Sequence, residues 1–188
     1  MIRARAHVST ILKLTLVSAC AAMVFLWPNW RAALANGGYY QEGRMTGGGG
    51  CTTTDLNTGK EIQVSHGFEL HCISSDEPNN LEVNWSVEGE TGSHRFHLDT
   101  LETAICTDEP GYDEGQPEAG FDTYQGSGTG SYDGVSGATA SWTFTDKGEP
   151  GKDDTLRITI SAGGQPVLSV SCPLGARGGN HQAHPAND

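Results

Sequence analysis

Basic residues are scarce in this 188-residue chain, which has 11 Lys and Arg against 23 Asp and Glu. The formal net charge of −12 repels polyanions, so nucleic acid and anionic lipid are poor partner candidates. Beyond residue 35 the sequence also has no apolar run approaching the roughly 20 residues that span a bilayer. We therefore expect no stable membrane insertion of the mature chain.

Catalytic signatures are missing as well. The sequence has no Gly-x-Ser-x-Gly elbow, no His-Glu-x-x-His motif and no phosphate-binding loop. Carboxylate pairs such as Glu69 and Glu82 could serve a hydrolase, but a chain with 23 acids contains such pairs by chance. We expect no catalytic residues, and a carboxylate-based hydrolase is the least favoured alternative.

The N-terminus has the pattern of a secretory signal. Basic residues precede an apolar run at residues 14–27, and Ala33-Leu34-Ala35 provides a small-x-small cleavage site. Lipid attachment at Cys20 is an alternative, although residues 21–27 stay apolar where a lipidated chain normally turns polar. Cleavage near Ala35 leaves 7 basic residues and a net charge near −16. The mature protein is expected to be secreted, periplasmic or at the cell surface.

Four cysteines remain after residue 35, namely Cys51, Cys72, Cys106 and Cys172. An even number of cysteines in an oxidising compartment indicates two disulfides, for which three connectivities exist. We favour Cys72–Cys106, which would tie the strands flanking a tryptophan-bearing strand. The pair Cys51–Cys172 would then join the two ends of the domain.

Alternation of apolar and polar residues predicts an all-β fold. It occurs in residues 61–72, 81–88, 94–99, 138–144, 156–160 and 168–172, separated by Gly-, Pro- and Asn-rich turns. Trp85 and Trp142 fall on the inward faces. About seven or more short strands are too many for one open sheet, so we expect a two-layer antiparallel β-sandwich stapled by disulfides. The expected domains are a signal peptide (1–35), a flexible Gly-rich lead-in (36–50), the β-sandwich (51–172) and a flexible tail (173–188).

Several segments, in order, resemble the post-COAP type of bacterial extracellular domain. They are HGFELHC (residues 66–72), PNNLEVNW (78–85), FHLDTLETAICTDEP (96–110), residues 126–160 and GNHQAH (179–184). The resemblance covers most of residues 44–184 and implies export, a β fold and no assigned catalytic activity. The family motif has Cys where Cys72 and Cys106 stand, but Ser and Gly where Cys51 and Cys172 stand. This departure is best explained by one added bridge and supports the favoured pairing.

An acidic loop and a group of aromatic residues are the candidate binding sites. The loop DKGEPGKDD could bind calcium weakly through Asp146, Glu149, Asp153 and Asp154, although it lacks EF-hand spacing and also fits a solvated turn. Histidines on strands and in the tail, such as His181 and His184, lack an evident set of three or four metal ligands.

Aromatic residues gather in the Gly-rich middle of the chain and could stack on sugar rings, or could cover one end of the domain. They are Tyr112, Phe121, Tyr124 and Tyr132. The sequence thus predicts an exported non-catalytic β module with a structural, adhesive or binding role, its partner unknown. The alternative is a protein that binds a glycan or small ligand through these loop aromatics.

Overall fold

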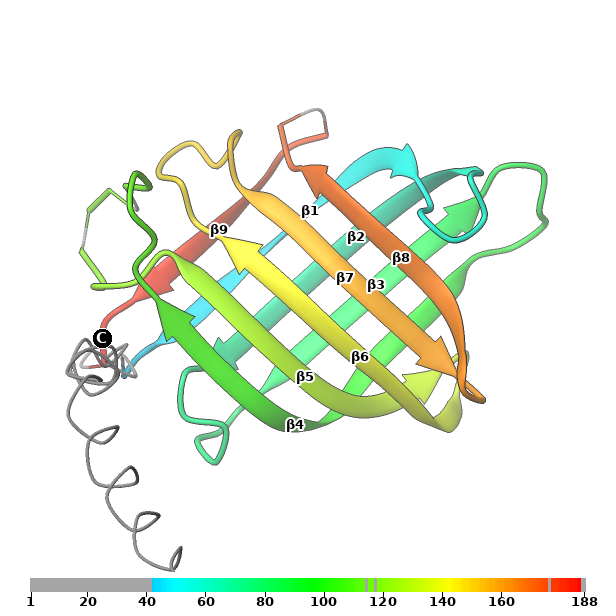
Figure 1. The fold of residues 1–188 in the computed structure, drawn as a ribbon, viewed down its shortest axis with the longest axis horizontal. Helices are drawn as coiled ribbons and strands as arrows, with labels where there is room; N and C mark the ends of the chain where they lie inside the picture. Colours follow the sequence, from blue (N-terminus) through cyan, green and yellow to red (C-terminus); the bar gives the residue numbers. More distant parts are fainter. Residues whose placement is uncertain (1–41, 114, 117, 176, 187–188) are drawn as a thin grey trace, which may run out of the picture. The chain divides into compact units, whose positions relative to one another are not determined.

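The computed structural model describes residues 42–113, 115–116, 118–175 and 177–186. The expected signal peptide and Cys20 lie outside these residues. Nine strands form one antiparallel sheet in the order β8-β7-β6-β5-β4-β3-β2-β1-β9 (Figure 1). Their bounds are β1 Arg44–Thr54, β2 Glu61–His71, β3 Asn80–Val87, β4 His94–Thr107, β5 Thr123–Tyr132, β6 Val135–Thr145, β7 Thr155–Ala162, β8 Gln165–Pro173 and β9 Gly179–His184. Within the described residues, no helix is long and apolar enough to cross a membrane.

The sheet is strongly curled, a half-barrel, so the prediction of a two-layer sandwich was wrong in its finer detail. The hydrogen-bonded ladder runs without a break from β3 through β4 to β5, where a sandwich would separate two sheets. The 14-residue β4 has two register shifts against β5, after Leu98 and after Leu101. Extra residues of this kind bend a strand and increase its twist, which lets one sheet fold over itself.

The curl brings β8 back to β1 (Figure 1). The amide of Leu56, just after β1, donates a hydrogen bond to the carbonyl oxygen of Ser169 in β8 at 2.8 Å. The Cys51–Cys172 disulfide joins the same two strands, with 6.4 Å between the Cα atoms. Contacts between the first and the eighth strand therefore hold the curl.

Apolar side chains on the concave face fill the interior. Both tryptophans, Trp85 and Trp142, are buried there as predicted, 2% and 3% exposed. Full burial extends to the following large side chains: Met45, Ile62, Leu70, Leu81, Phe96, Phe121, Tyr124, Phe144, Leu156, Ile158, Ile160 and Leu168. Strict alternation along each strand produces this core, because successive side chains point to opposite faces.

Both predicted disulfides are confirmed. Cys72 and Cys106 are bonded with their Cα atoms 5.7 Å apart, and Cys51 is bonded to Cys172. The bridge between Cys72 and Cys106 links β4 to the residue that follows β2, so it spans the strand that carries Trp85. Two disulfides indicate an oxidising location, extracellular or periplasmic.

Residues 44–50 of the predicted lead-in and residues 179–184 of the predicted tail belong to the sheet, which corrects both assignments. Gly47 to Gly50 lie in β1 between β2 and β9. A Cβ atom on Gly47 would lie 2.4 Å from the Asn180 oxygen, and one on Gly48 would lie 2.8 Å from the His66 oxygen. The glycine run thus permits close approach of three backbones, and the tail supplies β9 as the third.

Candidate functional site

The outer face of β4–β8 carries rows of hydroxyl groups across the strands. One in-register row is Thr103, Ser127, Ser141, Thr159 and Ser169. Within it, Thr103 Oγ1 lies 2.7 Å from Ser127 Oγ, and Thr159 Oγ1 lies 3.2 Å from Ser169 Oγ. The next row is Ile105, Gln125, Thr143, Arg157 and Ser171. Neighbouring strands lie about 4.8 Å apart, so these side chains form a regular polar grid.

Charge is almost excluded from the β5–β8 part of this face, whereas β4 contributes Arg95, Asp99 and Glu102. The four strands β5 to β8 contain no Asp or Glu and one charged residue, Arg157. In contrast, 18% of the whole chain is charged and its net charge is −12. The acidic residues are therefore concentrated elsewhere in the chain.

A hollow of about 410 Å³ opens within the grid. It is lined by Thr103, Ile105, Gln125, Gly126, Ser141, Trp142, Thr143, Arg157 and Thr159. Ile105 is 42% exposed and supplies an apolar wall, while the hydroxyls, the amide and the guanidinium supply donors and acceptors. No carboxylate is among the lining residues in the described part of the chain.

The backbone positions of these groups follow from the strand register. Thr143 faces Arg157 directly across β6 and β7, and Ser171 faces Arg157 across β7 and β8. Gln125 faces Thr143, so the amide and the guanidinium are separated by one hydroxyl. The hollow can thus offer a row of hydrogen-bonding groups to a polar ligand.

The predicted calcium ligands do not converge. Asp154 accepts hydrogen bonds from the main-chain amides of His181 at 2.7 Å and of Lys147 at 2.7 Å. Asp146 accepts from the amides of Ala183 and Gly148, both at 2.9 Å. Among the described residues, no group of three or more His, Cys, Asp or Glu is arranged to hold a metal ion. The two carboxylates instead hold the β6–β7 loop against β9.

The other two acids of this loop point elsewhere. Glu149 accepts a hydrogen bond from the Asn180 side-chain amide at 2.8 Å, and Asp153 is exposed beside Lys152. Burial raises the pKa of Asp146 to about 6, although its two amide donors favour the ionised form. Burial also raises the pKa of Asp154.

The four candidate aromatic residues are not brought together as a ligand platform. Phe121 and Tyr124 are fully buried, and the Tyr124 hydroxyl donates to the His71 carbonyl oxygen at 2.8 Å. Burial raises the pKa of this hydroxyl. These two rings therefore have no exposed face on which a sugar could stack.

Tyr112 and Tyr132 have separate surroundings. Tyr112 is 39% exposed, and the Lys147 ammonium lies 4.2 Å from the centre of its ring. The half-buried Tyr132 stacks on Trp85 with 5.6 Å between ring centres, and its hydroxyl lies 2.9 Å from Nδ1 of His94. Each tyrosine already has a partner within the protein.

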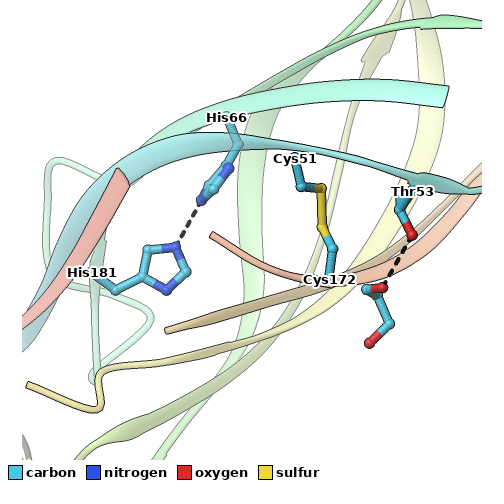
Figure 2. Close-up of a disulfide and its surroundings, with 6 residues drawn as sticks. Cys51, Thr53, His66, Cys172 and His181 are labelled. Atoms are coloured by element: carbon cyan, nitrogen blue, oxygen red, sulfur yellow. Dashed lines mark hydrogen bonds between the residues drawn. A yellow bond between two sulfur atoms is a disulfide. The ribbon is translucent and has the colours of Figure 1, made fainter. Parts of the chain in front are cut away.

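Two histidines form a buried pair that sequence reasoning did not find. Figure 2 shows His66 and His181 pointing toward one another, with their Nε2 atoms 2.8 Å apart. Nδ1 of His181 lies 3.0 Å from the Thr145 carbonyl oxygen, which can only accept, so this nitrogen is the donor. With both rings neutral, Nε2 of His66 donates to Nε2 of His181. Burial lowers the pKa of His66 to about 4 and that of His181 to about 3.

The sequence contained signals for the charge-poor outer face and for the buried histidine pair. The strands that build the outer face show, in one stretch from residue 123 to residue 173, long runs without a charge. In GNHQAH, His181 and Ala183 alternate with polar residues, as in a half-buried strand, but the surrounding glycines favoured a tail. Neither signal identifies which strands become neighbours.

Comparisons of this chain with protein-family models, with curated proteins and with solved structures found no match. The resemblance to post-COAP domains therefore stays a prediction from the sequence.

Proposed function

We propose that this protein is an exported, non-catalytic module that binds a glycan on the outer face of β4–β8. The observation that supports this most strongly is the hollow of about 410 Å³, whose described lining combines hydroxyl, amide and guanidinium groups with an exposed isoleucine. Ligand sites commonly have volumes of about 300–1,000 Å³.

The chemistry of the hollow suits a sugar. Sugar hydroxyls both donate and accept hydrogen bonds, as do the side chains of Ser141, Thr143 and Thr159. The exposed Ile105 would pack against the C–H face of a sugar ring. The rows extend beyond the hollow across five strands, so a chain of several sugar units could lie along them.

A binding role is favoured over hydrolysis for a specific reason. Glycoside hydrolysis needs two carboxyl groups about 5–10 Å apart on either side of the bond that is cleaved. The described lining of the hollow contains no Asp or Glu. A ligand would therefore be held there without an acid to protonate it or a base to activate water.

The disulfides and the expected N-terminal signal support a role outside the cytoplasm. A glycan-binding module in such a place could attach a cell to a polysaccharide, which is the adhesive role expected from the sequence. The same face would serve that role, because it is the large charge-poor surface of the sheet.

The experiment is a glycan array followed by titration of the best ligand with two sets of variants. Replacing Thr143 and Thr159 with valine removes two hydroxyls from the hollow at nearly constant volume. The matched control is Thr52→Val, an exposed threonine on β1 outside the β4–β8 face. We expect the double variant to bind at least ~10-fold more weakly and the control to bind normally, since each lost hydrogen bond contributes about 1 kcal/mol. An array without any bound glycan, or equal affinity of both variants, would contradict the proposal.

A further inference from the structure

The single charged side chain of the hollow, Arg157, points to the kind of glycan. We infer that the ligand carries carboxylate groups, as a polyuronate does, and that Arg157 binds one of them. This inference rests on the proposed glycan-binding function and specifies its ligand class.

Arg157 differs from the other arginines of the strands. Arg44 lies 3.6 Å from Glu69, and Arg95 lies 4.0 Å from Glu82, so each has a carboxylate beside it. Among the described residues, the side chain of Arg157 has neither an ion pair nor a hydrogen-bond partner. Its exposed guanidinium is therefore available to an outside anion.

The neighbours of Arg157 favour an oxygen-rich anion. Thr143 and Ser171 flank it in register on the adjoining strands, about 4.8 Å away on each side. A guanidinium binds a carboxylate through two parallel N–H···O hydrogen bonds, and the flanking hydroxyls can donate to the same group or to adjacent sugar hydroxyls. A uronate unit offers both kinds of acceptor within one ring.

The acidity of the whole chain does not prevent Arg157 from binding a carboxylate. Strands β5–β8 contain no acidic residue. The acidic residues of the other strands are Glu61, Glu69, Glu82, Asp99 and Glu102, and none lines the hollow. At physiological ionic strength, charges farther away than about 8 Å are largely screened. Glu102, next to Thr103 in β4, is three strand spacings or about 14 Å from Arg157 in β7, so the guanidinium is the nearest charge to a carboxylate bound beside it. The net charge of the chain opposes long-range attraction of any polyanion, and the ion pair with Arg157 acts at short range.

The test compares polygalacturonate with the same polymer after methyl esterification, which keeps the sugar backbone and removes the charge. A sulfated polysaccharide and neutral dextran complete the panel. The full mature chain, Arg157→Gln, Arg157→Lys and the control Arg95→Gln are titrated with each polymer by calorimetry. Arg95 carries the same charge on β4 but does not line the hollow.

We expect the wild type to bind polygalacturonate at least ~10-fold more tightly than its methyl ester. Arg157→Gln should abolish that preference without weakening ester binding, Arg157→Lys should restore part of it, and Arg95→Gln should leave it unchanged. Equal binding of acid and ester, or preference for the sulfated polymer, would overturn the inference while leaving glycan binding intact. Failure of every polysaccharide to bind would overturn both proposals.

Discussion

The carboxylate of Asp154 accepts a hydrogen bond from the main-chain amide of His181 at 2.7 Å, and this contact occupies the outer edge of β9. Two residues further along β9, the main-chain amide of Ala183 donates a hydrogen bond to the Asp146 carboxylate at 2.9 Å. Side chains thus satisfy two backbone donors that a further strand would otherwise pair with. An exposed edge strand invites aggregation, so this arrangement also protects the sheet.

Asp154→Asn should therefore loosen β9. The carboxylate accepts from two amides with two oxygens, whereas an asparagine has a single acceptor oxygen, so one buried amide loses its partner. We expect a loss of about 1–3 kcal/mol in the free energy of unfolding. Urea denaturation measures this loss, and hydrogen exchange at the amides of residues 181 and 183 locates it.

The matched control is the adjacent exposed residue, in the variant Asp153→Asn, which should change stability by less than ~0.5 kcal/mol. Equal protection of the β9 amides in Asp154→Asn and wild type would contradict the assignment of this carboxylate to the edge of β9.

The glycine run of β1 gives a second prediction. In Gly47→Ala the new methyl group would lie 2.4 Å from the Asn180 carbonyl oxygen and 2.9 Å from the His181 Cα atom, so the backbone of β9 must move. We expect destabilisation of about 1–3 kcal/mol. Gly67→Ala, on the neighbouring strand β2, meets no atom within 4 Å and should be neutral or stabilise by about 0.4–1 kcal/mol. Thermal unfolding of the two variants measures this difference in stability, and equal melting temperatures would contradict the prediction that Gly47 has no room for a methyl group.

The two disulfides should differ in their contribution to stability. Cys51–Cys172 spans 121 residues and Cys72–Cys106 spans 34, so chain-entropy arguments give about 5 and about 4 kcal/mol. Replacing each pair with serines and measuring unfolding in urea compares them. Replacing Cys51 and Cys172 should lower the free energy of unfolding more, because their disulfide also holds β8 against β1. A melting temperature that does not change under full reduction would contradict both values.

Acid should destabilise the fold through the histidine pair. The pKa values of His66 and His181 are lowered by burial to about 4 and about 3, so the unfolded chain binds these two protons first as the pH falls below 6.5. Stability is thus fully present above pH 6.5 and is lost toward pH 4. Asp146 and Asp154 oppose this loss of stability, because burial raises the pKa of both carboxyl groups, that of Asp146 to about 6, and the folded protein binds these protons first.

Between pH 4.5 and 6.5 the unfolded chain binds up to two more protons at the histidines, which gives a slope of at most about 2.7 kcal/mol per pH unit, and the two carboxyl groups reduce this slope. Asp146→Asn removes one of the two opposing carboxyl groups, so the stability of this variant should fall more steeply with decreasing pH than that of the wild type. Urea unfolding at several pH values in that window measures both slopes. A stability of Asp146→Asn that does not fall with decreasing pH would contradict the role of the histidine pair, and identical slopes for the two proteins would contradict the opposing role of Asp146.

The sequence predicted the strands well, and the reason is local. Alternation in residues 61–72 and 81–88 requires only that successive side chains point to opposite faces, and both segments form strands with Trp85 inside. The two disulfides were also predictable, because four cysteines follow residue 35 and two of them, Cys51 and Cys172, lie at the ends of the expected domain. The glycine run was misread, because glycine in sequence does not distinguish a free linker from a strand whose neighbours leave no room for Cβ.

The candidate site was predicted poorly for a related reason. The loop aromatics and loop acids were chosen by residue type, but Tyr124 and Asp154 are buried and have partners within the fold. The polar hollow depends on which strands are neighbours. Its groups come from residue 103 in β4 to residue 159 in β7, and only the sheet order places them side by side.

By itself, the sequence determined which residues face inward, which cysteines are available to pair and which strand segments are free of acidic residues. The tertiary structure decided that one sheet curls over itself, that the C-terminal segment returns to β1, and that His66 meets His181 from 115 positions away. The physical reason is that side-chain alternation is a property of the local backbone. Curvature, strand order and edge closure depend on bulges, backbone clearance and contacts between residues far apart in the chain.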